Sequence, residues 1–398
     1  MTKDKNNDRA LSRRSFLKTA GGAAAVAGLA TGGVALSPWT AEAAALPKKW
    51  DETYDVVIIG SGFAGLAAAY EAKKAGASVV ILENMRTPGG NSIINGGVVS
   101  AAGSPLQAKE GIQDSPELLL SDMLRAGLNL NHLELAKMVA YRSNDTVQWT
   151  INELGVQYKD KCTQEGGHSV PRMYSTYNQS GGAIVQKQLA KLSELGVRPR
   201  TQAFLTQIYR DTDGRVKGVQ IRDKYVFPNA NSGSLKNIKA RKAVVLATGG
   251  FGNDVAFRAI QDPRLTAEFP STNQPGATSE ALREALRIGG TPLQLSWIQL
   301  GPWGSPDEQG MGLSPFFAQL LGAMDGLWVD TLTGKRFVNE LADRKIRADA
   351  IIKAGNKCIA FPDAAGYAFG QRAIAEALPN LMDRGVGKKD ETLEVMEA

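Results

Sequence analysis

The hydrophobic pattern near the start of the chain predicts a strand, a helix and a second strand. Residues 55–59 form an apolar run of strand length, which is typical of a strand buried on both faces. A glycine-rich turn over residues 60–65 follows at once, and the Ala-rich segment after it is expected to be a helix that ends at Gly76. Ser78–Leu82 predicts a second strand, parallel to the first and closed by Glu83. The predicted unit is therefore βαβ.

Further elements follow from the same patterns. The spacing of apolar residues predicts helices within residues 115–155, with Ser115-Pro116 as cap and first residue, over 181–195, and from Glu280 to about Ile288. Residues 204–210 and 215–221 alternate and are joined by Asp-Thr-Asp-Gly, which predicts a β-hairpin, and Ala243–Ala247 predicts another buried strand.

The texture of the sequence changes at about Ser296, where tryptophans, a Phe-Phe pair and Gly-Pro breaks become frequent. We therefore expect an α/β fold with a Rossmann-like domain over residues 50–295. A second, smaller domain of α+β type is expected over residues 296–398.

The first glycine turn has the spacing G-x-G-x-x-G between a strand and a helix, with an acid 23 positions beyond its first glycine. Gly60 would permit the tight turn, Gly62 would let the backbone approach a pyrophosphate, and Gly65 would let the helix pack on the strand. The helix amino-terminus offers N–H groups and a positive dipole to phosphates. Glu83 would accept hydrogen bonds from ribose hydroxyls, so a dinucleotide is expected here. A glycine turn without a ligand is the alternative.

Two further glycine segments are expected to face the same ligand. In Pro88–Gly97, two glycine pairs flank small polar residues, a pattern that suits a backbone lying against a flat ligand. Thr248-Gly249-Gly250 follows the last predicted strand and forms another strand-to-glycine junction.

The amino-terminal 43 residues are expected to be an export signal. Ser12–Lys18 contains paired arginines, an uncharged Ala/Gly-rich run extends from Thr19 to Leu36, and Ala41-Glu42-Ala43 has the spacing of a cleavage site. The segment resembles a twin-arginine signal, so we expect cleavage near Ala43 and a periplasmic or cell-surface location. A membrane anchor is the alternative, although five glycines make the run a poor permanent span.

Composition narrows the function classes. The chain of 398 residues is 43% hydrophobic and 22% charged, as in globular proteins. Half of the net charge of +6 lies in residues 1–43, and the remainder is nearly balanced, so a nucleic-acid partner is not expected. Cys162 and Cys358 are expected to be free and buried, with a bridge as the alternative. His132 and His168 are too few for a histidine-based metal site, and no metal is expected.

Taken together, five segments resemble the flavoprotein subunit family of fumarate reductases and succinate dehydrogenases, particularly its flavocytochrome c and urocanate reductase branch. The resemblance extends from about Tyr54 to Arg344 and rests on residues 57–65, 89–92, 247–250, 272–278 and 334–340.

The resemblance implies FAD as cofactor, an FAD-binding domain over residues 50–295 and a substrate-capping domain over 296–398, both incomplete. The expected cofactor-binding residues, from the glycine pattern and the resemblance together, are Gly60, Gly62, Ala64, Gly65, Glu83, Asn91, Ser92, Gly96, Gly97, Leu205 (through its backbone), Gly249 and Glu280. Glu280 departs from the family pattern, which has Thr-Gly-Asp-Gly where this chain has Thr-Ser-Glu-Ala.

Arg344 follows the Asn339-Glu340 motif by four residues. In the reductases that this chain resembles, that arginine gives a proton to the substrate while reduced flavin gives hydride to the neighbouring carbon. Ketosteroid dehydrogenases of the family have a tyrosine there, so the resemblance implies reduction of the C=C bond of an α,β-unsaturated carboxylate. A surface ion pair is the alternative for Arg344.

The chain departs from fumarate reductases at the substrate side. Gly301 stands where the family has a histidine that holds a fumarate carboxylate, so fumarate itself is not expected as substrate. Leu320 and Ala323 occupy the family's proton-relay positions. Other acids are open as relay groups, and two aromatic residues are open as walls for an acrylate-type or aromatic acid; these are Asp307, Glu308, Asp325, Asp343, Trp303 and Phe316.

Family members continue for well over a hundred residues beyond this point. A C-terminally truncated chain, or one completed by a partner chain, is therefore expected. No haem motif is present, so electrons would come from a separate donor such as a periplasmic cytochrome. The alternatives are an FAD-binding fragment or split subunit without activity of its own, and a flavoprotein of the ketosteroid dehydrogenase type.

Overall fold

A computed structural model describes residues 45–301, 326–368, 371, 372 and 375. The predicted export signal lies outside the described residues. So do several positions named above: Trp303, Asp307, Glu308, Phe316, Leu320, Ala323 and Asp325.

The larger part of the molecule is built on a five-stranded sheet with the strand order β2-β1-β7-β6-β5. Its strands are β1 (Glu52–Ile59), β2 (Val79–Leu82), β5 (Ala203–Arg210), β6 (Val216–Asp223) and β7 (Ser234–Leu246). β1 pairs in parallel with both β2 and β7, whereas β7, β6 and β5 pair antiparallel. The predicted βαβ unit is confirmed, because helix α2 (Phe63–Lys74) connects β1 to β2.

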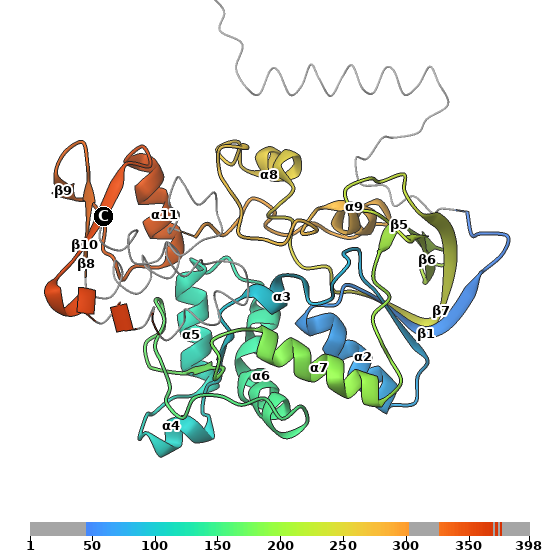
Figure 1. The fold of residues 1–398 in the computed structure, drawn as a ribbon, viewed down its shortest axis with the longest axis horizontal. Helices are drawn as coiled ribbons and strands as arrows, with labels where there is room; N and C mark the ends of the chain where they lie inside the picture. Colours follow the sequence, from blue (N-terminus) through green and yellow to red (C-terminus); the bar gives the residue numbers. More distant parts are fainter. Residues whose placement is uncertain (1–44, 302–325, 369–370, 373–374, 376–398) are drawn as a thin grey trace, which may run out of the picture.

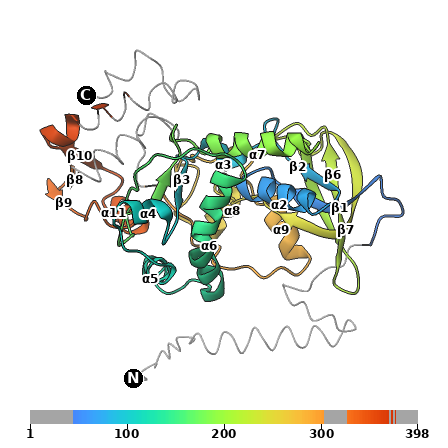
Figure 2. The same ribbon diagram turned by 90° about the horizontal axis from the view of Figure 1, so that it is seen from below.

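Strand β1 is buried on both faces towards its carboxyl end, as its apolar run predicts. Val57 and Ile59 pack with residues of β5, β6 and β7 on one face. Ile58 packs on the other face against α2 and α7 (Gly182–Glu194), which lie side by side over the sheet (Figures 1 and 2). This packing fixes the turn that follows β1 between two layers.

Strand β7 differs from its prediction in length and in burial. It begins nine residues before Ala243, because its polar first half pairs antiparallel with β6. The strand predicted at Ala243–Ala247 is confirmed as the carboxyl end of β7, but the expectation that it is buried is wrong: Leu246 is 42% exposed. The reason is its position, since Leu246 lines a cavity at the carboxyl edge of the sheet.

Most of the remaining helices and short strands lie between the main sheet and the carboxyl-terminal lobe, whereas the helix over Glu280–Arg287 packs against β5 (Figure 1). Ser115 caps α5, its Oγ accepting the Leu118 N–H at 3.2 Å, as the sequence predicts. The elements are α3 (Gly90–Ile94), β3 (Val98–Ser100), α4 (Pro105–Lys109), α5 (Pro116–Ala126), α6 (Leu133–Asn152), β4 (Met173–Ser175), α8 (Val255–Gln261) and α9 (Glu280–Arg287).

A second, smaller sheet forms a separate lobe (Figure 1). It has the order β10-β8-β9, with β8 (Gly326–Asp330), β9 (Lys335–Arg336) and β10 (Cys358–Pro362), and helix α11 (Arg344–Lys353) lies between β9 and β10 in the chain. An α/β main domain with a smaller α+β lobe is thus confirmed; the exact boundary at 296 stays a prediction.

Among the described residues, no helix combines the length and the apolar character needed to cross a bilayer. The same residues contain no group of three or more His, Cys, Asp or Glu side chains that could hold a metal ion. Cys162 and Cys358 are both free, but only Cys162 is buried.

Candidate cofactor site

A cavity of about 460 Å³ opens where β1, β2 and β7 end, which is where ligands bind in open α/β sheets. Its size is within the range of small-molecule and cofactor sites. The residues around it come from the glycine turn after β1, from the end of β2, from α3, β5 and β7, and from the segment that leads into α9.

The glycine turn after β1 leaves no room for side chains. Gly60 has φ +100°, and a Cβ built on it would lie 2.3 Å from the Ala247 carbonyl oxygen. A Cβ on Gly65 would lie 2.0 Å from the Gly60 carbonyl oxygen, so this glycine allows α2 to pack against the turn. A Cβ on Gly62 would lie 2.9 Å from Ser92 Oγ. Gly60 and Gly65 therefore have the steric roles that their spacing predicts, whereas the approach of a pyrophosphate to Gly62 stays a prediction.

Helix α2 begins at the cavity without a side-chain cap. Gly62 occupies the cap position, the first turn contains no acidic residue, and Gly62, Phe63 and Ala64 all line the cavity. The Phe63 N–H donates to Ser92 Oγ at 3.0 Å. A helix amino-terminus of this kind favours a bound anion, since its first N–H groups lack partners within the helix and its dipole is positive there.

Glu83 is buried at the tip of β2 and forms one wall of the cavity. Its Oε2 accepts the N–H of Ser61 at 3.1 Å and the hydroxyl of Ser61 at 2.6 Å, and its Oε1 accepts the N–H of Met85 at 2.9 Å. The Ser61 hydroxyl also accepts the Gly89 N–H at 2.9 Å. Ser61 thus joins the first glycine turn to the second, a role that the sequence analysis missed and that only its place between two glycines could have suggested.

The opposite wall is held by Asn91. Its side-chain nitrogen donates to Asn273 Oδ1 at 2.6 Å, and its oxygen accepts the Gln274 N–H at 2.7 Å. A third wall contains Phe204, whose ring stacks on Tyr225 with centroids 4.6 Å apart. These contacts connect segments distant in sequence, and none of them was predicted.

The structure brings most of the predicted cofactor residues to this one cavity. Those that line it are Gly60, Gly62, Ala64, Glu83, Asn91, Ser92, Leu205, Gly249 and Glu280. Gly65 lies behind the turn, and Gly96 and Gly97 are not among the lining residues. Gly97 has φ +67°, and a Cβ on it would lie 2.2 Å from Thr176 Oγ1, so packing already requires a glycine there. Its contact with the cofactor stays a prediction.

Arg344 lies apart from the cavity lining, at the first position of α11 in the smaller lobe. Asp343 caps this helix, its Oδ1 accepting the Ile346 N–H at 3.0 Å. Neighbouring protein groups partly desolvate the guanidinium and lower the pKa of Arg344, while the negative charge of Glu165 opposes this shift. The catalytic role of Arg344 stays a prediction.

The residues around the cavity fit an adenine dinucleotide. A pyrophosphate and its ribose require three features, and all three are present. They are glycines at positions where a side chain would clash, a helix start without a side-chain cap, and a buried acid at the tip of a strand. Fold and cavity together define a dinucleotide-binding protein of the Rossmann-like class.

The comparison with known families agrees with this class. The family described as "FAD binding domain" matches residues 55–383, and the chain belongs to this family of fumarate reductase-like flavoproteins. Its cofactor is FAD.

Individual relatives are reductases of unsaturated acids. The chain is 44% identical over 346 residues to the acrylate reductase flavoprotein subunit of Shewanella woodyi, which corresponds to 87% of this chain and 67% of that protein. It is 33% identical over 318 residues to a fumarate reductase (cytochrome) of Shewanella frigidimarina, covering 79% of this chain and 52% of that one. The open form of a flavocytochrome c3 fumarate reductase has a TM-score of 0.66 at 27% identity, over 88% of this chain and 55% of that one. The chain thus spans between half and two thirds of the length of these relatives.

Proposed function

We propose that this chain is an exported, FAD-dependent reductase of the C=C bond of an α,β-unsaturated carboxylate. The observation that carries the proposal is the 44% identity to the acrylate reductase subunit, which extends over 87% of the chain. The cavity supports the proposal because it offers FAD its expected residues at one edge of the sheet.

FAD, once bound and reduced, supplies hydride to one carbon of the double bond. In this proposal the residues of the chain bind the cofactor and supply the proton. The start of α2 receives the pyrophosphate, and Glu83 accepts hydrogen bonds from the ribose. Arg344 gives a proton to the carbon next to the one that receives hydride. An arginine has a pKa above ~12 and is a weak acid at neutral pH, so this step requires a preorganised guanidinium.

The proposed substrate is an acrylate-type acid rather than fumarate. Gly301 stands where the resembling fumarate reductases hold one carboxylate with histidine. An acid with a single carboxylate does not need that contact. The fold is also shared with ketosteroid dehydrogenases at 23% identity, which concerns the fold alone.

Export by the twin-arginine route to the periplasm or cell surface is part of the proposal, on the evidence of the paired arginines and the small residues up to Ala43. Electrons then come from an external donor such as a periplasmic cytochrome. The second candidate is a flavin-binding subunit that is active only with a complementing chain, since the relative from Shewanella woodyi is named a flavoprotein subunit.

The test uses the chain loaded with FAD and reduced anaerobically with dithionite. Acrylate should reoxidise the reduced flavin and fumarate should not, as followed by flavin absorbance. Arg344→Ala should abolish reoxidation, whereas Lys345→Ala, a charge removal at the next position of α11, should leave it nearly unchanged. A loaded wild-type chain that no unsaturated acid reoxidises contradicts the first candidate, and restoration by a separate carboxyl-terminal chain supports the second.

A further inference from the structure

A tight turn over residues 165–168 lies against the segment that leads into Arg344. The His168 N–H donates to the Glu165 carbonyl oxygen at 3.2 Å and closes the turn. A Cβ built on Gly166 would lie 3.6 Å from the Ala342 carbonyl oxygen and 4.0 Å from an amino group of Arg347. The backbone next to Glu165 therefore lies close to the residues that precede Arg344 and to the Arg347 guanidinium.

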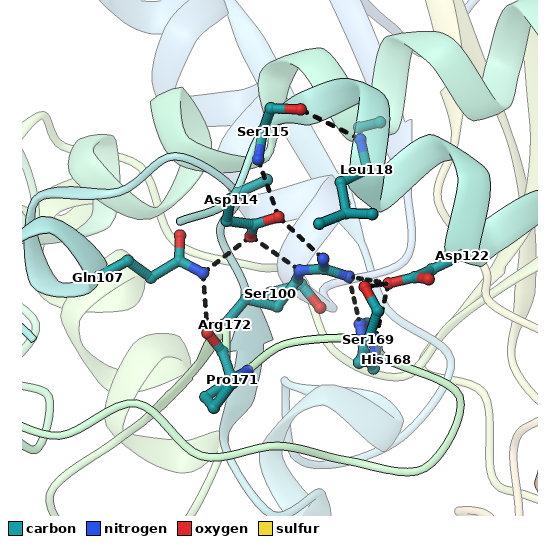
Figure 3. Close-up of polar contacts among 12 residues, drawn as sticks. Ser100, Gln107, Asp114, Ser115, Leu118, Asp122, His168, Ser169, Pro171 and Arg172 are labelled. Atoms are coloured by element: carbon teal, nitrogen blue, oxygen red, sulfur yellow. Dashed lines mark hydrogen bonds and ion pairs between the residues drawn. The ribbon is translucent and has the colours of Figure 1, made fainter. Parts of the chain in front are cut away.

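This turn is anchored by a buried ion cluster (Figure 3). Arg172 is fully buried and donates to both oxygens of Asp114, at 2.9 Å each, and to Oδ2 of Asp122 at 2.6 Å. Asp122 also accepts the N–H and the hydroxyl of Ser169, at 2.9 and 2.8 Å. His168 Nδ1 lies 2.9 Å from the Arg172 guanidinium. Charge-assisted bonds on both sides of Arg172 hold the carboxyl end of the turn to Asp114, just before α5, and to Asp122 within α5.

The turn carries a carboxylate to a place where two guanidinium groups lie close together. Arg344 and Arg347 are three residues apart on α11, hence on one face, and their positive charges repel each other. Arg347 is buried, lies over the Trp328 ring at 5.7 Å and donates to the Glu340 carbonyl oxygen at 3.2 Å. The half-buried Glu165 interacts electrostatically with both arginines and favours the charged form of each.

We propose that Glu165 is a positioning residue for Arg344: it orients the guanidinium and returns the proton that Arg344 gives to the substrate. This inference rests on the proposed role of Arg344. It assigns the relay to a loop of the main domain, whereas the family's relay positions carry Leu320 and Ala323 in this chain.

The proton balance of the relay is simple. Arg344 loses one N–H proton to the substrate carbon and becomes a neutral guanidine. A proton from water then passes through the Glu165 carboxylate to that nitrogen, which re-forms the guanidinium, regenerates the carboxylate and leaves hydroxide in the solvent. Water reaches Glu165 at its half-exposed side. No electrons move in these steps, and the net proton comes from solvent.

The pH dependence of this relay depends on all charged groups around the turn. Helix α11 and its cap contribute Arg344, Arg347 and Asp343, and the loop itself contributes His168 and Arg172. Helix α5 contributes Asp122 and Arg125. The Arg125 guanidinium donates to the Gly167 carbonyl oxygen at 3.3 Å. Among these, burial and the charge of Arg172 lower the pKa of His168, so this ring stays neutral at pH 7. The Glu165 carboxylate is the acidic group of the turn that interacts electrostatically with both Arg344 and Arg347.

The test compares Glu165→Gln and Glu165→Asp in the FAD-loaded chain, with Glu134→Gln on the surface of α6 as a matched removal of one negative charge. Glu165→Gln should lower kcat for acrylate at least tenfold with KM within threefold, and should increase the solvent deuterium isotope effect. Glu165→Asp should recover part of kcat. In Glu165→Ala, added formate should restore turnover, because a small acid can replace the missing carboxyl. Flavin absorbance and thermal unfolding should match wild type.

The outcomes separate the two proposals. If wild type turns over acrylate and Glu165→Gln leaves kcat, the isotope effect and the pH profile unchanged, the relay is refuted and the proposed function stands. The relay is also refuted if the Glu165 variants lose flavin or unfold at a lower temperature than wild type, while neither added formate nor the Glu165→Asp substitution restores turnover. That result would show that Glu165 has only a structural role. If the loaded wild-type chain does not reduce any unsaturated acid, the proposed function fails and the relay fails with it.

Discussion

Replacing Gly65 with alanine adds one methyl group at the contact between α2 and the turn after β1. The new Cβ would lie 2.0 Å from the Gly60 carbonyl oxygen and 3.0 Å from its carbon. Both atoms belong to the backbone, so no side-chain rotation can relieve the overlap. The start of α2 must move away from the turn.

The size of this movement follows from the contact itself. An ordinary contact begins at 3.4 Å, so the overlap at 2.0 Å requires a shift of about 1.4 Å. Overpacking of this kind costs about 1–3 kcal/mol of stability. A shift of the helix start also misplaces the N–H groups that would receive the pyrophosphate, and one hydrogen bond to a charged group contributes about 1.5–3 kcal/mol. The Kd for FAD should therefore rise about 10- to 150-fold.

The measurement is titration of the apoprotein with FAD, read by flavin fluorescence and absorbance, together with thermal unfolding. Gly76→Ala is the matched control at the other end of α2. Gly76 has φ +81° with no atom near its Cβ position, so alanine there costs about 1–2 kcal/mol in backbone strain but leaves the cavity intact. Gly65→Ala should weaken FAD binding and Gly76→Ala should not. Equal FAD affinity in wild type and Gly65→Ala would refute this account of the turn.

Two further substitutions test the polar contacts. Ser61→Ala removes the hydroxyl between Glu83 and the Gly89 N–H, so it should lower the free energy of unfolding by about 1–3 kcal/mol and weaken FAD binding, as checked by urea unfolding and FAD titration; an unchanged midpoint would contradict this role. Arg172→Met leaves buried carboxylates unpaired and should cost about 3–5 kcal/mol at pH 7, measured by urea unfolding. Burial alone would raise the pKa of Asp122, but hydrogen bonds from Ser169 and Arg172 lower it to about 2. The stability that the ionised Asp122 contributes is therefore fully present above the unfolded-state pKa of ~3.9 and is lost as pH falls towards 2. The cost of Arg172→Met should accordingly shrink below about pH 4, and a pH-independent cost would refute the assignment.

The parts of the fold that the sequence predicts are those whose information is local. The apolar run over residues 55–59 and the glycines at 60, 62 and 65 are adjacent in sequence. Gly65 is constrained chiefly by Gly60 within the same unit, whereas Gly60 meets the residues just after β7 and Gly62 meets Ser92 of α3. Glu83 could be expected because the helix between two parallel strands has a narrow range of lengths. The position of the glycine turn and of Glu83 at the ends of β1 and β2 was therefore predictable.

Contacts between distant segments could not be predicted in the same way. Asn91 reaches Asn273 and Gln274 across more than 180 positions, and neither asparagine stands in a pattern that indicates its partner. In the first half of β7, buried and charged residues alternate only over Ile238–Arg241, and Leu235 is 52% exposed, so the pairing with β6 gives only a short periodic signal. Both features depend on where the chain returns, and a single sequence does not encode that in its spacing.

The same distinction applies to the proposed proton supply. Arg344 is marked by a local motif, whereas Glu165 lies 179 positions earlier, in a loop with no apolar period. The position of Glu165 is set by Arg172, whose charge is buried. Ion pairs with Asp114 and Asp122 offset the free-energy cost of burying that charge. The Arg172 cluster is costly to bury and contributes little net stability. Its presence is therefore better explained by the position that it gives to the turn over residues 165–168 than by a gain in folding free energy. If Glu165 needs that geometry, weakening the cluster with Asp114→Asn should reduce kcat in parallel with Glu165→Gln, and a variant that loses stability but keeps kcat would separate the cluster from the reaction.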